Sequence, residues 1–183
     1  EFLCAMGLAD EFTEKMAKFI TEREDTEQIL QALTEQNAFV TRLSDGKTYR
    51  FHHMMKECAE RAFSTLDGEK QTIYYNRYGR WYENHEMYIH ALNAYWKCRN
   101  YDALLSVVQK DAGILLASLE PAEVLDCLAK CPVSVLKEHP LTILVLMRSM
   151  FNWKQIPKML ELKEILMAAI REHPDWTPEE RGN

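Results

Sequence analysis

Residues 49–62 read Tyr-Arg-Phe-His-His-Met-Met-Lys-Glu-Cys-Ala-Glu-Arg-Ala, and this stretch decides the fold of the first third of the chain. Its first residues alternate as a returning strand does, and residues 39–43 alternate in the same way before them. The turn between the two contains Gly46, which is free to take a positive φ. The pattern therefore predicts a β-hairpin followed by a helix over residues 52–66, which Asp67 and Gly68 end.

Two amphipathic helices are predicted before the hairpin. The first covers residues 10–20, and the second starts at a cap made by Asp25 and Thr26 and ends near Asn37. Apolar side chains share one face of each helix, namely Phe12, Met16, Phe19 and Ile20 on the first and Ile29, Leu30 and Leu33 on the second. Two helices, a hairpin and a third helix in this order are the plan of a winged-helix module, which we assign to residues 1–67.

Every segment of residues 68–183 is predicted to be helical, with short joints that make neighbouring helices antiparallel. Apolar residues recur in three stripes, which are Tyr74, Tyr78, Trp81 and Tyr82; Tyr88, Leu92, Tyr95 and Trp96; and Tyr101, Leu104, Leu105, Val108, Ala112 and Leu115. Pro121 and Pro140 suit the first turn of a helix, and residues 141–153 are apolar nearly all round, as in a central helix. We therefore expect a mainly α chain whose second part is a tetratricopeptide-like superhelix. Residues 173–183 look like the start of a further joint.

The composition is that of a globular domain, since 47% of the 183 residues are hydrophobic and 27% are charged. No apolar run approaches the ~20 residues that cross a bilayer, and no secretion leader is recognisable, so we expect a cytoplasmic chain without membrane contact. The five cysteines are scattered and suit reduced thiols, with Cys127 and Cys131 as small core residues.

Direct DNA binding by the winged-helix module is disfavoured by charge. The second helix, which would enter the major groove, has Glu24, Asp25, Glu27 and Glu35 in or beside it and no Lys or Arg. These acidic groups oppose the phosphate contacts that supply nonspecific affinity. The hairpin carries Arg42, Lys47 and Arg50, but three cations on a hairpin are commonly a solvated face, and the net charge is −6.

Other candidate sites are weaker. His52 and His53 do not have metal-ligand spacing, so a role at the strand-to-helix junction is favoured, with one ring packed inward and the other facing solvent or a neighbouring module. Nine aromatic residues between Tyr74 and Tyr101 form either an interhelical core or a concave surface for a ligand or partner; the candidates for that surface are Tyr78, Trp81, Tyr95 and Trp96. No nucleophile elbow or paired acids are recognisable, so we expect no catalysis.

Two stretches resemble a known family. Residues 49–59 keep the first five positions of an aromatic-Arg-aromatic-His-His-Leu-Phe-Arg-x-x-Leu run, and Trp81-Tyr82-Glu83, Ala91-Leu92 and Arg99-Asn100-Tyr101 follow as in that family. Arg99-Asn100-Tyr101 stands where a Gly-Asp-aromatic turn is usual. The chain thus resembles the large ATP-responsive, STAND-type transcription regulators of the LuxR superfamily, the group typified by the maltose regulator.

The resemblance implies a nucleotide-binding module before the winged helix, a helical sensor after it, and a LuxR-type helix-turn-helix at the end of the whole protein. The glycines lie at least eleven positions apart, so no phosphate loop is present and no cofactor is expected in this chain; ATP is expected upstream. Arg50, His52 and His53 would couple the nucleotide module to the sensor, which would answer a small-molecule inducer or a protein effector. A free-standing helical-repeat adaptor that binds a protein partner is the alternative.

Overall fold

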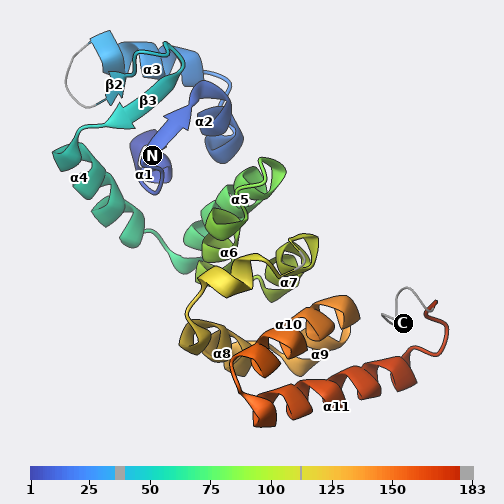
Figure 1. The fold of residues 1–183 in the computed structure, drawn as a ribbon. Coiled ribbons are helices and arrows are strands. Elements are labelled where there is room, and N and C mark those ends of the chain that lie inside the picture. The colour runs from blue at the N-terminus through green and yellow to red at the C-terminus, as the bar shows by residue number, and fades with distance from the viewer. Residues whose placement is uncertain (36–39, 112, 178–183) are drawn as a thin grey trace. The chain divides into compact units, whose positions relative to one another are not determined.

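In the computed structural model, which describes residues 1–35, 40–111 and 113–177, the chain is mainly helical and has one small sheet near its N-terminus (Figure 1). Its internal contacts divide it into two compact units, Glu1–Asn84 and His85–Asn183. The predicted fold class, mainly α with a winged-helix module first, is confirmed. The predicted helix end at Asn37, the strand start at Phe39 and the stripe residue Ala112 lie outside the described residues.

The described residues of the first unit form a three-stranded antiparallel sheet among five helices. In chain order its elements are α1 (Phe2–Met6), β1 (Glu11–Thr13), α2 (Glu14–Thr21), α3 (Thr26–Glu35), β2 (Val40–Arg42), β3 (Thr48–Phe51), α4 (His53–Ser64) and α5 (Gly68–Asn84). The strand order is β1-β3-β2, so β3 is central and pairs with both neighbours. The chain thus runs from a helix and a strand through two helices to the β2–β3 hairpin. This order is the winged-helix arrangement, and the hairpin is its wing.

Strand β1 corrects the predicted helix over residues 10–20. Phe12 lies opposite Tyr49 in the sheet, and its ring centroid is 5.2 Å from that of Phe51. Thr13 is then the N-cap of α2, because its extended backbone lets Oγ1 accept a hydrogen bond from the Met16 amide at 3.2 Å. Phe12 is thus buried through the sheet and not on a helix face. A strand of three residues is too short to show a period of its own.

The β2–β3 hairpin is closed as predicted. Gly46 has a φ of 68°, a backbone conformation that would be strained in a residue with a side chain. The Asp45 carboxylate accepts hydrogen bonds from the backbone amides of Lys47 and Thr48, both at 2.9 Å. The Thr48 hydroxyl donates a third, and these bonds lower the pKa of Asp45 to about 2. The wing is therefore held by its own turn.

The predicted stop signal after α4 instead starts the next helix. Helix α4 ends at Ser64, and Asp67 accepts a hydrogen bond from the Lys70 amide at 2.9 Å. Gly68 is the first residue of α5, so Asp67 acts as an N-cap.

Helix α5 is bound to the first unit by contacts that are distant in sequence. The buried Tyr78 hydroxyl donates to the Ala5 carbonyl at 2.9 Å. Arg77 donates to the Ile20 carbonyl at 2.9 Å, and the ring centroids of Trp81 and Phe19 are 5.5 Å apart. The first unit therefore extends to Asn84, whereas the domain boundary that the sequence places after residue 67 stays a prediction.

The second unit is all helical within its described residues. Its elements are α6 (Tyr88–Lys97), α7 (Tyr101–Lys110), the 3-10 helix η1 (Leu115–Ser118), α8 (Pro121–Lys130), α9 (Val133–Lys137), α10 (Pro140–Asn152) and α11 (Ile156–Glu172). Pro121 and Pro140 lie in first helical turns, as predicted. Helix α10 packs against α7, α9 and α11 and buries Ile143, Leu146 and Met150, so it is the central helix that its apolar sequence predicts.

The same three-residue joint connects two helix pairs of this unit, α6 to α7 and α10 to α11. Arg99 and Lys154 take the left-handed conformation at the middle of the joint, with φ of 56° and 57°. The next residue closes it in each case: the Asn100 amide donates to Tyr95 O at 2.9 Å, and the Gln155 amide donates to Met150 O at 2.8 Å. This repeated geometry agrees with a helical repeat, and the tetratricopeptide-like class stays a prediction.

Candidate functional site

The strand-to-helix junction exposes both histidines. His52 precedes the first residue of α4, its carbonyl accepts from the Lys56 amide at 2.9 Å, and its Nε2 lies 3.2 Å from Thr41 Oγ1. His53 is 86% exposed in its side chain, with Nδ1 3.4 Å from a Glu57 carboxylate oxygen. The expectation that one ring packs inward is therefore wrong. Phe51, at the end of β3, is the junction residue that enters the core.

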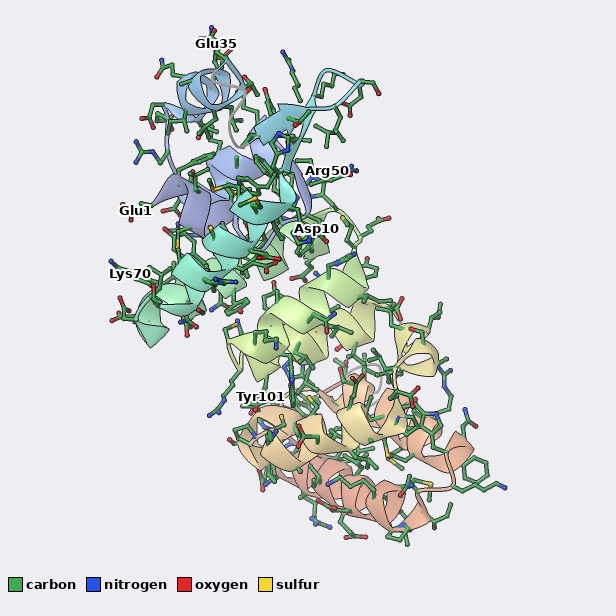
Figure 2. The ribbon with its side chains drawn as sticks, turned by 90° about the vertical axis from the view of Figure 1, so that its left-hand side faces the viewer. Glu1, Asp10, Glu35, Arg50, Lys70 and Tyr101 are labelled. Atoms are coloured by element: carbon green, nitrogen blue, oxygen red, sulfur yellow. The ribbon has the colours of Figure 1, made fainter. Side chains whose placement is uncertain are left out.

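Charged residues from three elements surround these histidines. Arg50 on β3 forms an ion pair with Glu11 on β1, to which its Nε donates at 3.0 Å. Lys56 Nζ on α4 lies 3.0 Å from Asp10, and its side chain is largely buried. The residues that line an open depression here, which with His52 we name the junction surface, are Asp10, Glu11, Arg50, Phe51, His53 and Lys56. Figure 2 shows Arg50 and Asp10 on the same side of the first unit.

The sequence identified Arg50, His52 and His53 but not Asp10, Glu11 or Lys56. The pairing of Glu11 with Arg50 depends on the β1–β3 register, which joins residues 39 positions apart. No sequence pattern signals that contact, because a three-residue strand is too short to show a period of its own. The paired charges leave a polar surface of mixed sign, and a mixed surface suits a protein neighbour better than a polyanion.

Helix α3 occupies the recognition-helix position of the winged helix and has no cation. Glu24 and Asp25, just before it, form ion pairs with Lys18 and Arg23. Glu27 and Glu35 remain on the helix, and Figure 2 shows Glu35 at its end. The helix therefore offers nothing to neutralise phosphate.

Two of the four aromatic residues proposed for a concave surface are buried. Tyr78 is 1% exposed and Tyr95 is 2% exposed, so neither is available to a ligand or partner; both are buried, as the interpretation of these rings as an interhelical core holds. Trp81 is half-buried against Phe19. Of the four, Trp96 alone lines the cavity described next.

A cavity of about 190 Å³ lies within the second unit, among α6, α7, η1, α8 and α10. Its walls are mainly leucine and valine side chains. Asn93, Glu123 and Asp126 are its polar lining residues, and Cys127 also contributes.

The two cysteines near this cavity, the half-buried Cys127 and the buried Cys131, are unreactive thiols. Burial raises the pKa of Cys127 to about 12 and that of Cys131 to about 11. Both stay protonated near neutral pH, so they are poor nucleophiles.

In the described residues, no group of three or more His, Cys, Asp or Glu side chains is placed to hold a metal ion. No helix of the described chain has the length and apolar character of a membrane span.

Comparison with known proteins finds a similarity in the first part of the chain. Residues 1–72 match the family model of the MalT winged helix domain. The match covers the sheet, α1 to α4 and the first turn of α5, and it includes the whole junction surface. This similarity supports a segment of a MalT-like transcription regulator. No curated protein and no solved structure matches the chain.

Proposed function

We propose that this chain is a non-catalytic middle segment of a signal-responsive bacterial transcription regulator. It would couple an upstream nucleotide-binding module to a helical sensor. The observation that carries the proposal is the combination of a MalT-like winged helix with a recognition helix that has no cation. A winged helix that is unsuited to DNA but exposes a charged junction is suited to contact another protein module.

The junction surface is the proposed docking site of the nucleotide-binding module, which would bind ATP in the whole protein. His52 and His53 are exposed and adjacent, so they are able to contact that module without disturbing the core. Arg50 and Lys56 hold the two sides of the depression through Glu11 and Asp10. A change in nucleotide state would alter this contact and shift the regulator between closed and open forms.

The other parts of the proposal follow from the same assignment. The second unit would belong to the sensor that answers a small-molecule inducer or a protein effector. DNA binding would come from a LuxR-type helix-turn-helix elsewhere in the whole protein, and the protein would act in the cytoplasm. This chain would need no cofactor of its own.

The test places His52→Ala, His53→Ala and Arg50→Ala, one at a time, in the whole regulator. We expect each change at an exposed histidine to alter inducer-dependent transcription of a reporter, because the contact with the nucleotide module is lost. Thermal melts of the 183-residue chain with the same changes give the free energy of unfolding. For the two histidines we expect that free energy to change by no more than about 0.5 kcal/mol, since exposed substitutions are usually that mild.

Arg61→Ala is the matched control. Arg61 lies on α4, the helix that begins with His53, and its side chain is highly exposed. In the described residues it pairs only with Glu57, so its loss should leave the reporter response unchanged. An unchanged response at all three junction residues would remove the coupling role and favour a free-standing helical-repeat adaptor.

A further inference from the structure

We infer that the cavity of the second unit is a binding site for a small, mainly apolar molecule with a positively charged end. The inference rests on the proposed function only in giving this molecule the role of a signal. Binding itself is a property of the second unit and is measured without the rest of a regulator.

The inner wall of the cavity is apolar and already formed. Leu105 and Val108 on α7, Leu116 on η1, and Val124 and Leu128 on α8 are all buried and line it. An apolar cavity of about 150 Å³ in another protein stays dry and binds benzene. A cavity of about 190 Å³ therefore has room for one aromatic ring and a short side chain.

The charges among the lining residues select the sign of the ligand. Asp126 is paired with Lys130 at 2.6 Å, and Lys130 Nζ also lies 5.5 Å from the Trp96 ring centroid. Glu123 is exposed and has no ion-pair partner within residues 1–35, 40–111 and 113–177. Among the residues that line the cavity, Glu123 therefore carries the one charge without an ion-pair partner in the described residues, and that charge is negative. An amine is favoured there, and a carboxylate is opposed.

The experiment titrates the isotope-labelled 183-residue chain with indole, phenethylamine and phenylacetate and follows backbone amide shifts by NMR. These probes share one aromatic group and differ in charge. We expect saturable shifts at residues that line the cavity. Phenethylamine should bind about two- to fivefold more tightly than phenylacetate, the range that one exposed charge pair supplies. Glu123→Gln should bring these two affinities together.

Two variants fill the cavity and one does not. Leu119→Phe and Cys127→Phe each add volume at a lining residue, so either one should abolish binding if it folds. Ile114→Phe is the matched control, because Ile114 is 74% exposed on the neighbouring segment and does not line the cavity. It should bind as the unchanged chain does.

The results separate this inference from the proposed function. If none of the three probes gives saturable shifts at the lining residues, or if both filled variants fold and still bind, the cavity is a packing defect and the inference fails. Equal affinity for amine and carboxylate in the unchanged chain overturns the charge assignment. None of these outcomes touches the junction residues, whose reporter test decides the coupling role independently.

Discussion

Gly7, the residue that follows α1, is pressed against the backbone of α4. A Cβ built on Gly7 lies 2.8 Å from the Ala59 carbonyl carbon and 2.9 Å from the Ala59 Cβ. Real Cβ atoms do not approach so closely, and backbone atoms have little freedom to retreat. The close packing of α1 on α4 therefore depends on the absence of one methyl group.

Gly7→Ala should destabilise the chain by about 1–3 kcal/mol, the usual cost of overpacking a filled core. Chemical denaturation measures this change. Gly68→Ala is the matched control, because no atom lies within 4 Å of the added Cβ and the residue begins a helix. There we expect a change between zero and about 1 kcal/mol of stabilisation. Equal effects at the two glycines would show that α1 and α4 do not meet as described.

At the scale of elements, α5 is attached to the rest of the first unit by the buried hydrogen bond of Tyr78, by polar contacts of Arg77 and by ring contacts such as that of Trp81 with Phe19. The Tyr78 hydroxyl is the donor for the Ala5 carbonyl, and burial raises the pKa of Tyr78 well above its ordinary value. Removal of that hydroxyl leaves a buried carbonyl without its partner, which is costlier than the loss of an exposed hydrogen bond.

Tyr78→Phe should lower the free energy of unfolding by about 1–2 kcal/mol. The control on the same helix is Tyr74→Phe, since the Tyr74 hydroxyl makes no hydrogen bond within the described part of the chain and its ring contact with Phe63 is kept. We expect that control to change stability by less than about 0.5 kcal/mol. If the two variants melt alike, the contact between α5 and α1 is not formed in solution.

At the scale of the whole molecule, charge argues against DNA binding. The chain has a net charge of −6, and α3 contributes only acidic ionisable groups. Of the cations on the wing, Arg50 is already paired with Glu11.

We therefore expect the 183-residue chain to bind duplex DNA more weakly than about 10 µM at physiological salt. Fluorescence anisotropy with a labelled duplex and with its sequence-scrambled counterpart measures this. Saturable binding at lower concentration that is lost in Arg42→Ala would instead make the wing a DNA contact.

Most of the fold was predictable from local patterns. The glycine in the hairpin turn, the proline at the start of α8 and the apolar run of α10 each indicated their elements, because turn chemistry and helix periodicity act over a few residues. Strand β1 was missed, because a strand of three residues is too short to show a period of its own.

For the candidate sites, too, some features follow from local sequence and others depend on tertiary packing. By itself the sequence determined the winged-helix order, the place of His52 and His53 between a strand and a helix, and the acidic character of α3, since these depend on residue type and short spacing. Only the tertiary structure decided that neither histidine enters the core, that Glu11 pairs with Arg50, and that Tyr78 and Tyr95 are buried while Trp96 lines a cavity. The physical reason is that burial and ion pairing depend on which distant segments pack together, and the period of a single helix does not specify its neighbour.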